Sequence, residues 1–182
     1  MRKSNLIMTK EVEEYLSALD GWMKYFGMER IASEPNWLFD RAYRRTRVEL
    51  SKFGQSNTYS FIKYAETPDV KNFELFSRES FNYAMSLPKS IPVGLGSMVA
   101  VYPCYLVNRI TKELADFVKN YLNKHYASFE FPGILDMFSK DLYYYPTTPV
   151  WGALYYNGFR KEIYNMYSPK AWNEILKTQN AK

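Results

Sequence analysis

Few residues in this chain are suited to covalent or metal chemistry. It has one histidine, His125, and one cysteine, Cys104. A thiol beside an imidazole can act as a nucleophile with its base. Cys104 lies in an apolar run, however, where burial raises the pKa of a thiol and makes it unreactive. One histidine and one cysteine make a zinc site only with two carboxylates added. We therefore expect no metal ion and no cofactor, and we assign no catalytic residue.

Three carboxylates gather near a predicted β-hairpin: Glu130, Asp136 and Asp141. Glu130 and Asp136 are six residues apart, so a strand would direct both to one face, about 20 Å apart along it. That separation is too long for an acid/base pair. We interpret this face as a partly solvated surface and Asp141 as a turn residue. A metal-dependent hydrolase or nuclease that uses these three carboxylates is the alternative function.

A basic cluster contains Arg41, Arg44, Arg45 and Arg47. On a helix, the spacings of three and four residues would put Arg41, Arg44 and Arg45 on one side. Asp40 would then pair with Arg44, and Arg45 with Glu49. We interpret the cluster as a solvated, self-paired helix face. A nucleic-acid-binding module that uses the Arg41–Arg47 helix face against phosphates, chiefly Arg41, Arg44 and Arg45, is a second alternative, which we do not favour.

Aromatic residues are unusually frequent, with 17 Tyr, 12 Phe and 4 Trp among 182 residues. The consecutive Tyr143, Tyr144 and Tyr145 cannot all face one side of a strand. Either helices cover both faces of the sheet, or an aromatic surface is offered to a partner. The helix predicted to follow carries Trp151 and Tyr155. We predict that Tyr143, Tyr145, Trp151 and Tyr155 line a ligand-binding surface, and the sequence leaves open whether residues 143–145 are buried.

Periodicity and turn residues predict the elements that would position these side chains. Apolar residues at helical spacing predict a first helix over 9–26, and a capping serine with a closing glycine predicts a second helix over 33–53. Pro103 lies inside a predicted buried strand, so we expect that strand to be an edge or to carry a bulge. After the second helix we expect strand 58–65, helix 77–85, loop 87–97, strand 98–107, a helix from 111, strand 129–137, turn 139–141, strand 142–145, a helix from about 149 to 167 and a last helix from 169.

This order predicts an α+β fold, in which an N-terminal helical hairpin precedes a small mixed sheet of four strands with helices packed on it. The order from residue 58 is β-α-β-α-β-β-α. A helix between strands favours a parallel crossover, whereas the final hairpin is antiparallel. We expect a single domain over 1–182, with a helical part over about 9–57 and an α/β part over about 58–182.

Composition narrows the class of protein. Hydrophobic residues make up 47% and the formal net charge is +5, which excludes a disordered chain. No run of about 18 apolar residues would span a membrane, and the first apolar run is too short for a signal peptide. A lone cysteine suits the cytoplasm. We therefore expect a cytoplasmic, non-enzymatic domain that binds a small molecule or a protein, with a homodimer as a further expectation.

Overall fold

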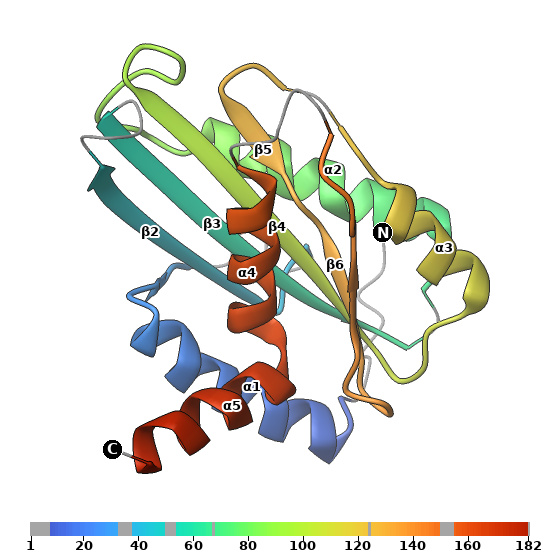
Figure 1. The fold of residues 1–182 in the computed structure, drawn as a ribbon. Coiled ribbons are helices and arrows are strands. Elements are labelled where there is room, and N and C mark those ends of the chain that lie inside the picture. The colour runs from blue at the N-terminus through green and yellow to red at the C-terminus, as the bar shows by residue number, and fades with distance from the viewer. Residues whose placement is uncertain are drawn as a thin grey trace.

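The computed structural model describes residues 8–32, 38–49, 54–66, 68–123, 125–149 and 155–181. Within these ranges five helices surround a seven-stranded mixed sheet (Figure 1). The predicted α+β class, with an N-terminal helix ahead of a mixed sheet, is confirmed. The elements are α1 (Lys10–Tyr25), β1 (Glu29–Arg30), β2 (Arg41–Glu49), β3 (Gly54–Ala65), α2 (Val70–Ser86), β4 (Ser97–Val107), α3 (Lys112–Asn120), β5 (Ser128–Glu130), β6 (Gly133–Asp136), β7 (Leu142–Tyr144), α4 (Tyr156–Tyr167) and α5 (Pro169–Asn180).

The strand order is β1-β2-β3-β4-β6-β7, and β5 pairs with β4 beside the start of β6. The first three strands form an antiparallel meander. Strand β4 runs parallel to β3, β5 and β6, and β6 and β7 form the predicted antiparallel hairpin. From β3 onward, the element order therefore matches the predicted one, apart from the division of the strand over 129–137 into β5 and β6.

The predicted second helix is wrong over 41–49, where the chain forms β2. This strand pairs with β3 along its whole length, from Arg41 opposite Ile62 to Glu49 opposite Gly54. Tyr43, Thr46 and Val48 are residues that favour strands. The prediction of a helix rests instead on a capping serine and a closing glycine. Residues 38–40 are described and form a turn and a bend instead of a helix, whereas residues 33–37 and 50–53 lie outside the described residues. With β1 and β2 added, the sheet is wider than the predicted four strands.

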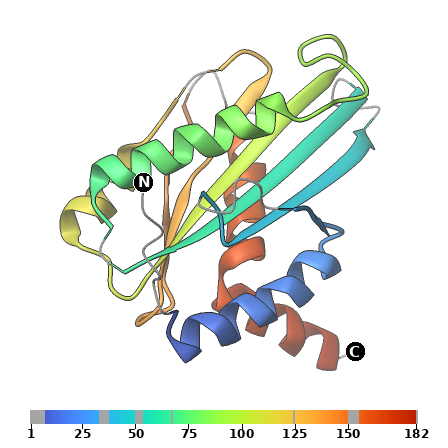
Figure 2. The same ribbon diagram turned by 180° about the vertical axis from the view of Figure 1, so that it is seen from behind.

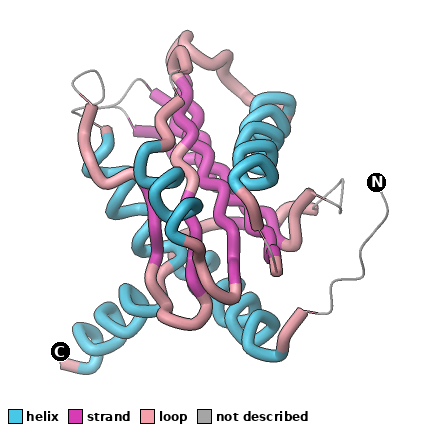
Figure 3. Tube along the Cα trace, turned by 90° about the vertical axis from the view of Figure 1, so that its right-hand side faces the viewer, coloured by secondary structure: helices cyan, strands magenta, loops and turns pink. Residues whose placement is uncertain are grey.

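Both faces of the sheet are covered. Helices α1, α4 and α5 pack on one face around Leu16, Tyr102 and Ile163, and α2 and α3 pack on the other around Phe73, Val101 and Val118. Figures 1 and 2 show α4 and α2 crossing opposite faces, and Figure 3 shows helices on both sides of the strands. All residues of β4 are buried, which explains why β4 reads as a continuous apolar run.

Pro103 lies in this central strand, so the predicted edge or bulge position is wrong. The carbonyl groups of Val101 and Val107 accept hydrogen bonds from Phe131 and Met137 on the β5/β6 side. Because backbone direction alternates along a strand, the Pro103 nitrogen faces the same side. There, β5 ends opposite Val101 and β6 begins opposite Cys104. The missing N–H therefore coincides with the gap in the ladder between β5 and β6.

No helix in the described ranges combines the length and the apolar character needed to cross a bilayer.

Candidate functional site

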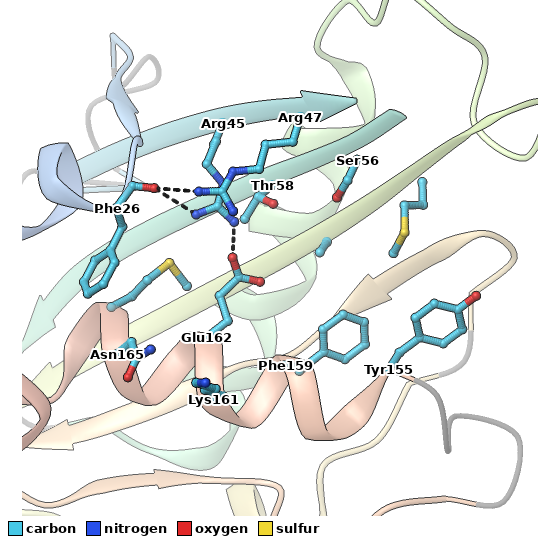
Figure 4. A pocket seen from close by; sticks show the side chains of 14 residues that line it. Phe26, Arg45, Arg47, Ser56, Thr58, Tyr155, Phe159, Lys161, Glu162 and Asn165 are labelled. Atoms are coloured by element: carbon cyan, nitrogen blue, oxygen red, sulfur yellow. Dashed lines mark hydrogen bonds and ion pairs between the residues drawn. The ribbon is translucent and has the colours of Figure 1, made fainter. Parts of the chain in front are cut away.

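A pocket of about 330 Å³ lies between the sheet face of β2, β3 and β4 and helix α4, beside the end of α1 (Figure 4). This volume is at the lower end of the range for small-molecule sites. Strands β2–β4 form its floor, and α4 forms its wall. The lining residues are Phe26, Arg45, Arg47, Ser56, Thr58, Met98, Ala100, Tyr155, Gly158, Phe159, Lys161, Glu162, Asn165 and Met166.

Small side chains leave this space open between a sheet and a helix that pack closely elsewhere. The floor contains Ser56, Thr58 and Ala100. On the same sheet face, two residues further along β3, Ser60 lies opposite Tyr102 of β4, whose bulky side chain is fully buried. On the helix, a Cβ atom built on Gly158 would have no neighbour within 4 Å. The hollow therefore follows from the residues present, since large apolar side chains at these positions would fill it.

A polar network fixes one side of the pocket. Arg45 forms an ion pair with Glu162 and donates to the Phe26 carbonyl oxygen at 3.1 Å. The Tyr102 hydroxyl donates to the other Glu162 oxygen at 2.7 Å. Burial, followed by the charge of Glu162, raises the pKa of Tyr102, so this phenol stays a donor at neutral pH. The network ties β2 and β4 to α4.

The pocket is cationic. Its lining holds Arg45, Arg47 and Lys161 against a single carboxylate, Glu162, which is a difference of +2. Because Arg45 neutralises Glu162, the excess charge resides on Arg47 and Lys161. Arg47 is exposed and donates to the Phe26 carbonyl oxygen at 3.4 Å. Hydroxyl groups on the floor and aromatic rings on the wall complete a surface suited to an anion with both polar and apolar parts.

Predicted residues from two different groups meet in this pocket: Arg45 and Arg47, from the face proposed for nucleic acid, and Tyr155, proposed for a ligand. Arg41 and Arg44 do not join them. Because 41–49 is a strand, Arg44 faces the side opposite to Arg45, and the predicted sharing of one helix side is wrong. Arg41 faces the same side as Arg45 but is paired with Asp20 of α1 at 3.5 Å.

The predicted i,i+4 ion pairs of that helix are replaced by contacts between elements. Arg44 is directed to the opposite face from Arg45 and is 3.7 Å from Glu29 in the neighbouring strand β1. Arg45 pairs with Glu162 on α4, and the side chain of Glu49 is not among those described. The basic cluster is thus divided between two faces of the sheet.

Tyr143 and Tyr145 lie outside the pocket. Tyr143 packs against the core beneath α2 and α3, with the Lys119 ammonium group 5.3 Å from its ring centre. Tyr144 and Tyr145 pack against the core beneath α4, and the Tyr145 ring is 5.9 Å from that of Tyr156. All three rings are half-buried. Tyr143 also lines a shallow hollow of about 400 Å³ beside Lys119 and Arg160. Trp151 lies outside the described residues.

The three hairpin carboxylates do not share a site, and the interpretation of a solvated face is wrong for two of them. Asp136 is buried and accepts the backbone N–H groups of Ile110, Phe138 and Ser139 at 2.9–3.0 Å. Asp141 lies after the turn and pairs with Lys170, whose hydrogen bond lowers the pKa of Asp141. The structure contains no group of three or more potential metal ligands among the residues it describes.

Glu130, the third carboxylate, is the centre of a buried cluster that the sequence did not suggest. Its side chain is 1% exposed. It accepts hydrogen bonds from Ser77 and Tyr121 on one oxygen, at 2.5 and 2.8 Å, and from Asn123 on the other at 3.0 Å. His125 bonds the second oxygen at 3.1 Å and stacks on Phe81.

Cys104 is fully buried, and burial raises the pKa of its thiol. Its predicted unreactive environment is therefore present. His125 is engaged with Glu130, so the imidazole and the thiol form no catalytic pair here.

Lys161 and Glu162 were missed as site residues, whereas Arg47 belonged to the predicted basic cluster. Arg45-x-Arg47 on one strand and Ser56-x-Thr58 on the next would have indicated a polar sheet face, but only with β2 assigned as a strand. Comparison with protein-family models, with curated proteins and with solved structures finds no match to this chain.

Proposed function

We propose that this chain is a binding domain that holds a small amphipathic anion in the pocket between β2–β4 and α4. The observation that carries this proposal is the +2 balance of the lining residues, with Arg47 and Lys161 left over after Arg45 and Glu162 have paired. Arginine provides several N–H donors in a fixed plane, which suits carboxylate and phosphate groups. The rings of Tyr155 and Phe159 supply apolar surface for the rest of the molecule.

The proposal keeps the expectation of a single cytoplasmic domain. It favours a small molecule over a protein partner because the cationic groups lie in a concave site. A homodimer remains a separate prediction, which the oligomeric state in solution would test. A second function on the hairpin carboxylates has no comparable support, since Glu130, Asp136 and Asp141 are each engaged with different partners.

The test compares two neighbouring arginines on the same strand. Phenyl phosphate, a small aromatic anion, is titrated calorimetrically into the full chain and into Arg47→Gln and Arg44→Gln variants. A hydrogen bond to a charged group contributes about 1.5–3 kcal/mol, so Arg47→Gln should weaken binding by roughly 10- to 100-fold. Arg44→Gln, on the opposite face, should change the affinity by less than about twofold.

The paired variants also separate binding in the pocket from general attraction to a basic protein. Equal losses in both variants would mean that the anion responds to overall charge and not to this pocket. If neither phenyl phosphate nor another small amphipathic anion binds to the unaltered chain, the proposed function is rejected.

A further inference from the structure

The floor of the pocket changes its chemistry from one strand to the next. The strand register forms two rows across the sheet, Arg45–Thr58–Ala100 and Arg47–Ser56–Met98. Strand β2 therefore contributes cations, β3 contributes hydroxyl groups and β4 contributes apolar side chains. Neighbouring strands are about 4.8 Å apart, so charged and apolar ends are separated by about 10 Å.

Aromatic rings reinforce the apolar end. Tyr155 and Phe159 stack at 6.3 Å with an interplanar angle of 16°. Phe129 packs against both rings, at 5.2 Å from Tyr155 and 4.7 Å from Phe159. Figure 4 shows Tyr155 and Phe159 on the part of α4 that lies away from Phe26. A planar group at this end would meet aromatic faces and edges, which favour stacked or edge-to-face contact.

From this arrangement we infer that the ligand is a nucleoside monophosphate, an inference that rests on the proposed function. A nucleoside monophosphate has a charged phosphate, a polar ribose and an apolar base in that order, which matches the order of cations, hydroxyl groups and apolar side chains across β2, β3 and β4. The phosphate would lie by Arg47, the ribose hydroxyl groups would lie over Ser56 and Thr58, and the base would lie against Met98 and Tyr155. A smaller aromatic anion has no polar middle section and would leave the hydroxyl groups of β3 without a ligand partner.

Charge favours one phosphate over three. A phosphate monoester carries about −1.5 to −2 charges at neutral pH, which matches the +2 balance of the lining. A triphosphate would bring further negative charge toward Glu162, the pocket's own carboxylate, with no additional lining cation to neutralise it. We therefore expect nucleoside monophosphates to bind more tightly than the corresponding triphosphates.

Calorimetry on the full chain tests this with AMP, GMP, CMP and UMP, and with ATP, adenosine and phenyl phosphate for comparison. At least one monophosphate should bind about tenfold more tightly than phenyl phosphate and more tightly than its own nucleoside. Loss of a neutral hydrogen bond weakens binding by about three- to tenfold. Ser56→Ala should therefore weaken monophosphate binding to this extent and weaken phenyl phosphate binding by a smaller factor.

Three outcomes would overturn the inference. If phenyl phosphate binds and no monophosphate binds more tightly, the ligand class is wrong while the proposed function stands. If a short single-stranded oligonucleotide binds far more tightly than every monophosphate, the site belongs to a polymer and not to a mononucleotide. If neither phenyl phosphate nor a nucleotide binds, the inference and the proposed function fail together.

Discussion

Glu130 accepts four side-chain hydrogen bonds in a position almost closed to solvent. The donors come from α2, from the residue that ends α3 and from the segment before β5. One carboxylate therefore joins elements that are far apart in the chain. An ionised carboxylate only accepts hydrogen bonds, so four donors around it satisfy a group whose burial would otherwise be costly.

Replacing Glu130 with glutamine should destabilise the fold. The amide turns one accepting oxygen into an NH₂ donor, which then faces two donors. Leaving buried donors without an acceptor costs about 1–3 kcal/mol, and we expect Glu130→Gln to lower the free energy of unfolding by that amount in urea denaturation. Glu74→Gln, at an exposed position on α2, is the control and should change it by less than about 0.5 kcal/mol. Similar effects of the two variants would show that the cluster around Glu130 contributes little to stability.

At the scale of elements, β2 decides where the functional side chains lie. As a helix, residues 41–49 would have presented three arginines together. As a strand, they send Arg45 and Arg47 to the face of α4 and Arg44 to the other. Pairing with the neighbouring β3, at nine residues, makes residues 41–49 a strand. This pairing is a tertiary interaction, so the local spacing of charged residues does not predict it.

Other elements were predictable because their signals are local. Thr9 and Thr111 cap α1 and α3 through their side chains, at the residues where two of the predicted helices begin. Pro169 lies in the first turn of α5, where the predicted last helix begins. The candidate pocket could not be predicted from local signals of this kind. Of its lining residues, only Arg45, Arg47 and Tyr155 had been singled out, because a pocket between a strand and a distant helix depends on which small residues face each other.

Two glycines in different elements should respond oppositely to alanine. Gly21 lies inside α1 and is exposed, and a Cβ atom there has no neighbour within 4 Å. Gly21→Ala should stabilise the protein by about 0.5–1 kcal/mol, because glycine loses more backbone entropy in a helix. Gly54 has φ +95°, and its Cβ would lie 2.8 Å from the Gly96 carbonyl oxygen.

Gly54→Ala should therefore destabilise the protein by about 1–3 kcal/mol. Thermal unfolding of the two variants measures both effects. A stabilised Gly54→Ala variant would mean that the start of β3 tolerates a conformation other than the one described, and a destabilised Gly21→Ala variant would contradict the exposed position of Gly21 on α1.

At the scale of the whole molecule, a sheet with helices on both faces accounts for the abundance of aromatic residues. Two separate cores need rings, and Tyr43, Tyr102, Tyr156 and Tyr167 are each less than 2% exposed. Tyr143, Tyr144 and Tyr145 are each half-buried, because helices cover part of both faces of the sheet at this strand. Against this dense packing, the pocket beside α4 stands out as a polar and cationic hollow, and the function we propose depends on it.

The most direct measurement is an amide NMR titration of the full chain with phenyl phosphate. We predict that chemical shifts change with saturation at Thr58, Ala100 and Gly158, which belong to the floor and wall of the pocket. Residues of α2 such as Phe73, on the opposite face, should keep their shifts. Changes confined to the α2 and α3 face, or no saturable change at any concentration, would contradict the account.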